Sequence, residues 1–146
     1  MMQEDCIFCR IVGGELPCIK VYEDEDIVAF LDIAPVAKGH TLVIPKAHHN
    51  PITHTPDEVL HKLVSVVRKI AGAQIEGMNA DGVNVTQANG NAAGQIVPHV
   101  HFHVIPRFRA DGQGSNWTHG RYDSPEEMET QAKQIKNALG GTAGNG

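Results

Sequence analysis

The segment VPHVHFHVIP, residues 97–106, places three histidines at alternate positions in an otherwise apolar run. Its β-branched and aromatic residues favour an extended chain, in which successive side chains point to opposite faces. We therefore expect His99, His101 and His103 to share one face of a strand and the apolar residues between them to share the other. The two prolines of the run are expected to mark its ends. One face is then core, and the other is a row of titratable groups.

Three imidazoles on one face are compatible with three interpretations. They could bind a metal ion, because neutral imidazole is a ligand for zinc and iron. They could perform nucleophilic catalysis, in which one neutral imidazole attacks phosphorus and a neighbour donates a proton to the leaving group. They could also be structural and hydrogen-bond the backbone. Strict alternation of three histidines favours a chemical role over a purely structural one.

The loop before the histidines, NGNAAGQ at residues 89–95, is rich in small residues. Gly90 and Gly94 would let backbone N–H groups come close to an anion. Asn89 and Gln95 add side-chain amides. The loop therefore suggests a phosphate site, and the alternative is a plain connection, because Asn and Gly are common in turns. The sequence has neither a Walker-type phosphate loop nor a strand-linked G-x-G-x-x-G motif.

Cys6 and Cys9 form a C-x-x-C pair near the start of the sequence. A redox dithiol of the thioredoxin type needs a strand before the pair and a helix after it. A zinc half-site needs two further ligands, for which His48 and His99 are candidates. We favour zinc over redox chemistry because no strand precedes the pair. Cys18 stands alone and is expected to be a small, inert hydrophobic residue, since three cysteines fit a disulfide framework poorly.

The composition, 41% hydrophobic and 20% charged residues, is that of a soluble globular protein. The length suits one domain, residues 1–139, followed by a glycine-rich tail at 140–146 that is expected to be disordered. The net charge of −5 argues against nucleic acid or an anionic membrane as a partner. No apolar run approaches the ~20 residues that a membrane span needs, and no signal peptide opens the sequence, so a cytoplasmic location is expected.

The elements that must position these groups follow from apolar periodicity and turn residues. We expect a short helix over residues 6–12 that stops at Gly13 and Gly14. Strands are expected at about 20–23 and 27–32, joined by an acidic turn, and then at 41–45, at 82–86 and in the histidine segment.

Two longer helices complete the pattern. The sequence TPDE at residues 55–58 has the form of a capping box and opens the main helix, which ends near Gly77. SPEE at residues 124–127 repeats this form and opens a last helix to about Leu139. Strands that come mostly in adjacent pairs, with one long helix between the third and fourth, predict an α+β fold with a largely antiparallel sheet.

The sequence HVHFHVI at residues 99–105 resembles the H-φ-H-φ-H-φ-φ signature of the histidine triad (HIT) family, in which φ is an apolar residue. Further stretches resemble the bacterial members in order and spacing: CIFCRIV, AFLDI, GHTLVIPKAH, NGNAAGQ and IPR. The resemblance covers nearly the whole chain. It implies the HIT-like fold, α+β with a five-stranded, mainly antiparallel sheet, one long central helix and a C-terminal helix. It also implies a homodimer whose two sheets join across the interface, each subunit binding a purine nucleotide.

The resemblance implies a hydrolase or nucleotidyltransferase that acts at the α-phosphate of nucleotide conjugates, such as phosphoramidates or dinucleoside polyphosphates. His101 would be the nucleophile that forms a nucleotidyl-histidine, which water then hydrolyses. His103 would hold the α-phosphate oxygens, with Gln95 and the Gly94 backbone beside it. These implied roles are chemically reasonable, because hydrogen-bond donors from the loop would stabilise the negative charge that develops on the phosphoryl oxygens.

Other positions resemble the nucleoside-binding residues of the family. Asp32 resembles the residue that binds the ribose hydroxyls, and Asn89 resembles one that binds the phosphate side of the ribose. The apolar slot around the base would be formed by Ile7, Phe8, Ile11, Phe30, Leu31 and Ile33.

The C-x-x-C pair also resembles a zinc-holding subgroup of the family. Its ligands match Cys6, Cys9, His48 in the P-K-A-H block and the first triad histidine, His99. Two thiolates and two imidazoles make a closed set, which implies a structural zinc with no open position for water. A zinc-bound His99 cannot act as an acid, so His101 and His103 would do the chemistry.

The sequence departs from many relatives at position 96, where they carry a Ser or Thr that helps to bind the phosphate or to pass a proton. Ile96 can do neither, which leaves the activation of the leaving group open. This feature favours one alternative to the enzyme, a nucleotide-binding regulatory protein with negligible turnover. The third and weakest interpretation is a zinc-stabilised interaction module. Trp117, in the loop after the triad, is expected to pack, with a dimer or substrate contact as the alternative. No motif distinguishes the remaining histidines, which are His40, His49, His54, His61 and His119.

Overall fold

The computed structural model describes residue 3 and residues 5–114 and 117–143. Its strands are β1 (Lys20–Glu23), β2 (Ile27–Leu31), β3 (Thr41–Pro45), β4 (Gly82–Thr86) and β5 (Phe102–Arg107). Its α-helices are α1 (Ile7–Val12), α2 (Asp57–Met78) and α3 (Pro125–Ala143). Two short 3₁₀ helices, η1 (Ile52–His54) and η2 (Asn91–Ala93), complete the order.

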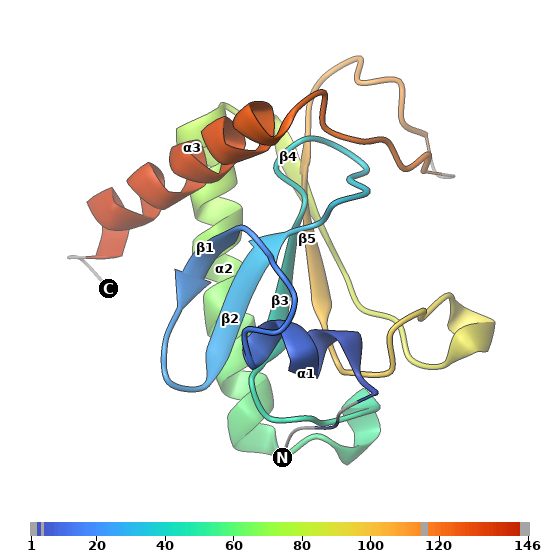
Figure 1. Cartoon of the computed structure of the whole chain (residues 1–146). Coiled ribbons are helices and arrows are strands. Elements are labelled where there is room, and N and C mark those ends of the chain that lie inside the picture. Colours follow the sequence, from blue (N-terminus) through green and yellow to red (C-terminus); the bar gives the residue numbers. More distant parts are fainter. Residues whose placement is uncertain (1–2, 4, 115–116, 144–146) are drawn as a thin grey trace.

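The five strands form one sheet in the order β1-β2-β3-β5-β4. Helix α2 lies across one face of this sheet, α3 packs against α2 and β1, and α1 lies on the opposite face (Figure 1). Every neighbouring pair of strands is antiparallel. The structure thereby confirms the predicted α+β fold with five strands, one long central helix and a C-terminal helix.

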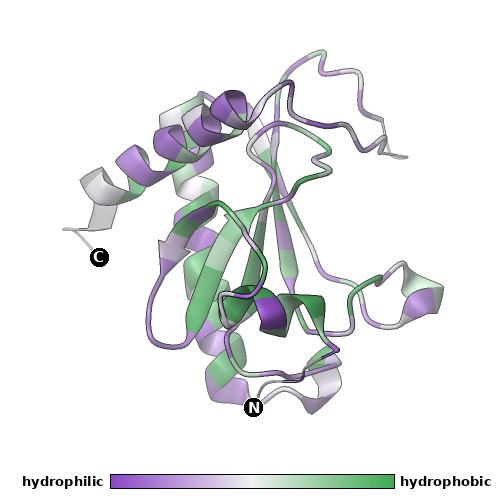
Figure 2. Cartoon of the chain, in the orientation of Figure 1, coloured by the Kyte–Doolittle hydropathy of each residue, from purple (hydrophilic) through white to green (hydrophobic). Residues whose placement is uncertain are grey.

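Alternation along the central strands divides the core between the two faces of the sheet. In β2, Ile27, Ala29 and Leu31 pack toward α2 and α3, whereas Val28 and Phe30 pack toward α1. A period of two is what a strand imposes on its side chains. Because helices cover both faces, every residue of β2 is buried. Figure 2 shows β2 and β3 as hydrophobic along their length and α3 as largely hydrophilic. Among the described residues, no helix has both the length and the apolar character to cross a membrane.

The turn before β3 is held from both sides. Gly39 O accepts a hydrogen bond from Gln74 Nε2 in α2 at 3.1 Å, and Gly39 N donates one to the Tyr122 hydroxyl at 2.9 Å. Gly39 has a φ of 98°, and a Cβ there would lie 2.5 Å from Met78 Cε. Glycine adopts this positive φ without strain, and any other residue would also have to displace the end of the Met78 side chain. The residue that follows, His40, is therefore held in a fixed position.

The histidine segment forms a strand only from Phe102 onward, where β5 begins. His99 and His101 precede it, in a stretch that is anchored by a hydrogen bond of 2.7 Å from Val100 N to His49 O. The predicted alternation is nevertheless confirmed. The apolar residues between the histidines pack in the core that contains α2, and the histidine rings lie on the side of α1.

Several element ends differ from the prediction. Pro106 lies inside β5 and not at its end, but pairing with β3 stops at Val104, so its missing N–H interrupts no ladder on that side. Helix α3 continues past Leu139 to Ala143, into the segment predicted to be disordered. Residues 144–146 of that tail lie outside the described residues.

The two predicted capping boxes have different outcomes. At α3, Ser124 Oγ accepts a hydrogen bond from Glu127 N at 3.1 Å, and the Glu127 carboxylate accepts one from Asp123 N at 2.7 Å. At α2, the Thr55 hydroxyl donates to Pro51 O at 3.0 Å and caps nothing. The capping box predicted at residues 55–58 is therefore wrong, because the preceding 3₁₀ turn supplies a competing acceptor.

Candidate active site and metal centre

His101 has the tautomer that a nucleophile requires. Its Nδ1–H donates a hydrogen bond to the His99 carbonyl, 2.7 Å away, and a carbonyl oxygen can only accept. The proton of the neutral ring is therefore on Nδ1, and the lone pair is on Nε2. Burial lowers the pKa of His101, which favours this neutral form. A ring held in this way can attack an electrophile through Nε2.

His40 and His103 form a hydrogen-bonded pair that lies beside His101. Nδ1 of the fully buried His40 accepts a hydrogen bond from Val36 N at 3.0 Å, so Nε2 of His40 carries the proton. That Nε2 lies 2.9 Å from Nδ1 of His103 and donates to it, which places the proton of neutral His103 on Nε2. Burial lowers the pKa of His40 to about 3 and that of His103 to about 4. The ring of His103, centred 5.1 Å from that of His101, therefore offers an N–H donor and no positive charge.

His40 is a candidate site residue that was not predicted from the sequence: it lies in the GHTLVIPKAH stretch, but only His48 of that stretch was assigned a role. The signal that could have found it is the strand order. Thr41 pairs with Val104 and Leu42 pairs with His103 across β3 and β5. His40, one residue before β3, therefore lies beside His103. The sequence predicted both strands but not that they are neighbours.

Asp32 lies next to the His40 ring, at the end of β2. Its Oδ1 accepts a hydrogen bond from Ala34 N at 2.9 Å, and its Oδ2 is 3.6 Å from His40 Nε2. Burial raises the pKa of Asp32, and the Ala34 N–H together with nearby imidazoles opposes that rise. Asp32, His40 and His103 are close enough together to hold a metal ion. The proton on His40 Nε2 leaves that atom without a lone pair for a metal, so we interpret the three as a hydrogen-bonded group.

The loop predicted to bind phosphate is held together by its own amides. Gln95 is buried, its Oε1 accepts a hydrogen bond from Gly90 N at 2.7 Å, and its Nε2 donates to Asn50 Oδ1 at 2.7 Å. Asn89 Oδ1 accepts a hydrogen bond from Ile52 N at 2.8 Å. Both predicted amide side chains therefore form hydrogen bonds within the protein and stabilise the shape of the loop.

A pocket of about 370 Å³ opens beside this loop. Its lining residues are Asn50, Gly90, Asn91, Gln95, Ile96 and Pro98. Ile96 is 89% exposed, so the side chain that stands in place of a hydroxyl is free at the pocket. Gly94 turns the loop with a φ of 93°, a conformation that glycine adopts without strain.

Helix α1 brings an aromatic side chain against the histidines. The ring centroid of Phe8 lies 5.1 Å from that of His101 and 5.8 Å from that of His99, with the rings edge to face. Phe8 also packs edge to face on Phe30 of β2, at 5.6 Å. The two aromatic residues of the predicted base slot, Phe8 and Phe30, are therefore in contact with each other, and Phe8 lies next to the triad.

The other predicted slot residues differ in exposure. Ile11 is half-buried against the hydrophobic cluster between α1 and the sheet, whereas Ile7 is 50% and Ile33 is 78% exposed. Leu31 is a correction, because alternation in β2 sends its side chain to the opposite face, where it packs with α2 and α3. It is therefore not part of a slot formed with α1.

Cys18 and Trp117 both contact other side chains of this chain. Cys18 is half-buried against the hydrophobic cluster between α1 and the sheet. Burial raises the pKa of its thiol, which keeps the thiol protonated and unreactive. Trp117 packs, with the Arg107 guanidinium carbon 5.8 Å from its ring centroid.

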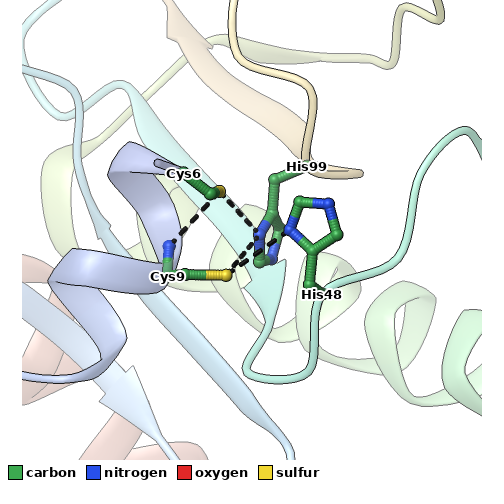
Figure 3. Close-up of side chains that lie close together, drawn as sticks. All are labelled: Cys6, Cys9, His48 and His99. Atoms are coloured by element: carbon green, nitrogen blue, oxygen red, sulfur yellow. Dashed lines mark hydrogen bonds between the residues drawn. The ribbon is translucent and has the colours of Figure 1, made fainter. Parts of the chain in front are cut away.

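Cys6, Cys9, His48 and His99 converge from three parts of the chain (Figure 3). The cysteines lie at the start of α1, His48 follows β3, and His99 precedes β5. Their ligand atoms all lie within 4.8 Å of one another. The structure thus brings together the four residues that were predicted to bind zinc.

The spacing of these atoms suits a tetrahedral ion. Nδ1 of His99 is 3.3 Å from Cys6 Sγ and 3.6 Å from Cys9 Sγ, and Nδ1 of His48 is 3.4 Å from Cys9 Sγ. Tetrahedral zinc would space sulfur and nitrogen ligands about 3.6 Å apart. Nε2–H of His99 donates to Pro45 O at 2.8 Å, which leaves the lone pair of Nδ1 facing the sulfurs.

Burial sets the charge that this group can carry. It raises the pKa of the Cys6 thiol, and it lowers the pKa of His48 and that of His99, the latter to about 4. Neutral imidazole is already the ligand form, and the buried thiols need a cation to become thiolates. The four side chains could therefore hold a divalent metal ion.

Known proteins resemble this chain in both sequence and fold. The family model described as HIT domain matches residues 13–110. The chain belongs to the HIT domain family. The resemblance that the sequence carries is thereby confirmed.

This HIT protein is 44% identical over 138 residues to Protein hit of Bacillus subtilis, a match that covers 93% of the chain and 95% of the relative. It is 41% identical over 135 residues to adenosine 5′-monophosphoramidase hnt1 of Schizosaccharomyces pombe, with coverage of 92% and 98%. Its fold matches the crystal structure of a Zn-bound histidine triad family protein from Mycobacterium smegmatis with a TM-score of 0.88 at 38% identity, covering 97% of this chain and 98% of that one.

Proposed function

We propose that this protein cleaves purine nucleotide conjugates at the α-phosphate through a nucleotidyl-histidine formed on His101. The observation that carries the proposal is the 2.7 Å hydrogen bond from His101 Nδ1 to His99 O, which leaves Nε2 as the free lone pair. The name of the yeast relative, an adenosine monophosphoramidase, supports the same class of substrate.

The reaction has two displacements at phosphorus. Nε2 of His101 attacks the α-phosphorus and forms an N–P bond, while the bond from phosphorus to the leaving nitrogen or oxygen breaks. The leaving group departs with the electron pair and takes up a proton from solvent, and the water molecule that attacks in the second displacement returns one proton to the solvent. Water then attacks the same phosphorus, the N–P bond breaks, and the nucleoside monophosphate is released with His101 restored. Splitting one difficult displacement into two is the gain from covalent catalysis.

The surrounding groups bind and orient the substrate. Nε2–H of His103 donates to an α-phosphate oxygen, where negative charge gathers in the transition state, and the backbone at Gly94 and Gln95 lies beside it. Asp32 accepts hydrogen bonds from the ribose hydroxyls, and Asn89 binds the phosphate side of the ribose. The base lies in the slot formed by Ile7, Phe8, Ile11, Phe30 and Ile33.

Zinc is the metal we propose for Cys6, Cys9, His48 and His99. The M. smegmatis structure of the same fold is described as Zn-bound, and the donor set here suits that ion. Zinc supplies a structural cross-link in this closed set. Its effect on catalysis is indirect, because His99 also provides the carbonyl that orients His101.

We further propose a homodimer in which the sheets of two subunits join. Strand β4 is the edge next to β5, and Val85 on it is 47% exposed. An open edge strand is a template for pairing with another chain. Sedimentation equilibrium should give twice the mass of the chain, and a monomer at micromolar concentration would contradict this arrangement.

Release of AMP from an adenosine 5′-phosphoramidate tests the enzyme directly. The wild type should turn over, while His101→Ala and His101→Asn should lose turnover and keep most of their AMP affinity, because the other contacts survive. His54→Ala, at an exposed histidine far from any motif, is the matched control. Mass spectrometry of the quenched wild-type reaction should find the nucleotidyl adduct on the peptide that contains His101. Hydrolysis by His101→Asn near the wild-type rate would disprove the assignment.

The alternative is a nucleotide-binding regulator with negligible turnover. The observation that favours it is the exposed, hydroxyl-free side chain of Ile96 at the pocket beside the loop. Tight AMP binding without hydrolysis of phosphoramidates, dinucleoside polyphosphates or nucleotidyl adducts would support the regulator over the enzyme.

A further inference from the structure

The segment after β5 is tied to the turn that follows β2 by three successive backbone carbonyls of that turn. Each carbonyl accepts one hydrogen bond from Gln113, His119 or Gly120. The bonds run from His119 Nδ1 to Ala34 O at 2.7 Å, from Gly120 N to Pro35 O at 2.7 Å and from Gln113 Nε2 to Val36 O at 2.9 Å. The turn at 34–36 is therefore bonded to residues 113 and 119–120, although about 80 residues separate the two parts in the sequence.

The other side of the same turn holds two site residues. Ala34 N donates to Asp32 Oδ1 at 2.9 Å, and Val36 N donates to His40 Nδ1 at 3.0 Å. One residue, Ala34, therefore bonds Asp32 through its N–H and His119 through its carbonyl. The ring centroid of His119 is 6.3 Å from that of His40, with the two rings inclined by 34°. His119 thus borders the site on the side of Asp32.

The tautomer of His119 is set by its partner. Ala34 O can only accept, so Nδ1 of His119 carries a proton and Nε2 of the neutral ring is an acceptor. Within residues 3, 5–114 and 117–143, this Nε2 has no hydrogen-bond partner, and the side chain is exposed. An acceptor that is held in place and left open beside a carboxylate suits a ligand that brings hydroxyl donors.

We infer that His119 is a second ribose-binding residue, whose Nε2 accepts a hydrogen bond from one of the two ribose hydroxyls while Asp32 accepts from the other. This inference rests on the proposed function, since it presupposes that the nucleoside lies against Asp32. A vicinal diol has two donors and is read best by two acceptors. The carboxylate alone would supply both acceptor atoms at a single residue, but its Oδ1 already accepts the Ala34 N–H.

A purely structural role for His119 is separable from ribose binding. Asparagine places its amide N–H where Nδ1–H of histidine stands, so His119→Asn keeps the bond to Ala34 O and removes Nε2. His119→Ala removes both. Gln113→Ala is the control for a loosened segment. It removes the bond to Val36 O and the two bonds to the Thr118 backbone, but it keeps the His119 side chain and its acceptor in Ala34.

Calorimetry on the full-length protein with AMP, 2′-deoxy-AMP and 3′-deoxy-AMP is the test. His119→Asn and His119→Ala should both bind AMP about three- to tenfold more weakly than the wild type, as expected for one lost hydrogen bond. For the deoxy analogue that lacks the hydroxyl bound by His119, neither variant should differ from the wild type. Gln113→Ala should keep the wild-type preference between AMP and both analogues.

Two results would overturn the inference. The first is wild-type AMP affinity in His119→Asn together with a loss in His119→Ala, which would make His119 only an anchor of the segment. The second is an equal loss for AMP and both deoxy analogues. Phosphoramidate turnover by the wild type distinguishes the failures: with turnover intact, either result refutes the role of His119 alone, whereas a wild type that neither binds AMP nor turns over refutes the proposed function as well.

Discussion

Nε2 of His40 donates a hydrogen bond to Nδ1 of His103 across 2.9 Å and joins two residues that are 63 positions apart. The chain of donors starts at Val36 N–H, which bonds Nδ1 of His40. Because each ring accepts at Nδ1 and donates at Nε2, a backbone amide in a turn fixes the tautomer of a histidine at the site. In the proposed reaction this makes His103 a donor to the phosphoryl oxygens and prevents it from acting as a base.

Removal of His40 should therefore impair turnover. His40→Ala leaves the buried N–H of Val36 unpaired and frees His103 to adopt either tautomer. We expect kcat/KM for an adenosine phosphoramidate to fall about 10- to 100-fold, which corresponds to the ~1–3 kcal/mol cost of an unsatisfied polar group. His54→Ala, at an exposed histidine, should match the wild type. Unchanged kcat/KM in a folded His40→Ala protein would show that His103 does not depend on His40.

The contrast between His40 and the triad shows what a sequence can reveal here. Local patterns were enough for the strands, the long helix and the triad, because alternation and spacing are written in consecutive residues. The four metal-binding candidates were also found, since cysteines and histidines are rare and chemically distinctive. His40 was missed because its partner is set by the order of strands in the sheet, which depends on long-range packing.

The errors in the predicted elements have the same origin. The Thr55 cap failed because Pro51 O, in the preceding turn, competes for the hydroxyl. The slot residue Leu31 was misplaced because a one-residue step along a strand changes the face, and the sequence resemblance groups residues without regard to face. The hydrogen bonds from Gln95 to Asn50 and from Ile52 to Asn89 could not be predicted either, because only the folded chain brings these partners together.

Asp32→Asn should weaken the discrimination between ribose and deoxyribose. An amide keeps one acceptor atom but loses the charge that strengthens hydrogen bonds from the hydroxyls. For the wild type we expect deoxy-AMP to bind more weakly than AMP by about 1–3 kcal/mol, and for the variant this difference should shrink by about half or more. Calorimetric titration with both nucleotides measures it. An equal affinity of the wild type for AMP and 2′,3′-dideoxy-AMP would remove Asp32 from the ribose site.

The pH dependence of stability should report the two buried imidazoles of His40 and His103. Burial holds the pKa of His40 at about 3 and that of His103 at about 4, while histidine in an unfolded chain titrates near ~6.5. The unfolded chain therefore binds more protons below pH ~6.5. The stabilisation from the neutral rings is complete above that pH and is lost progressively as the pH falls toward 4 and then 3.

Urea unfolding at a series of pH values between 7 and 4 measures this loss. His40→Gln should be less stable than the wild type at pH 7 but should show a shallower decline toward pH 4, since one depressed imidazole is gone. The comparison between the two proteins cancels the acid sensitivity of the metal centre, which both retain. His61→Gln, at an exposed position, should keep the wild-type slope. Parallel curves for the wild type and His40→Gln would contradict the depressed pKa of His40.

The proposed zinc at Cys6, Cys9, His48 and His99 makes the fourth prediction. Elemental analysis should find about one zinc per subunit, because four ligands complete a tetrahedral set. The double variant Cys6→Ser/Cys9→Ser should lose the metal and melt at a lower temperature, since the ion links α1 to the segments after β3 and before β5 and so closes long loops. Cys18→Ser is the matched control, because Cys18 lies outside the cluster and should leave zinc content unchanged.

Activity separates the structural role of the zinc from a catalytic one. A bound zinc would act on the proposed reaction only through His99, whose ring it would hold and whose carbonyl accepts the Nδ1–H of His101. The double cysteine variant, assayed below its lowered melting temperature, should therefore lose less turnover than His101→Asn. The bond from His99 Nε2 to Pro45 O persists without the metal and continues to hold the ring in part. Full stability of metal-free protein, or turnover that falls as far as in His101→Asn, would refute a purely structural zinc.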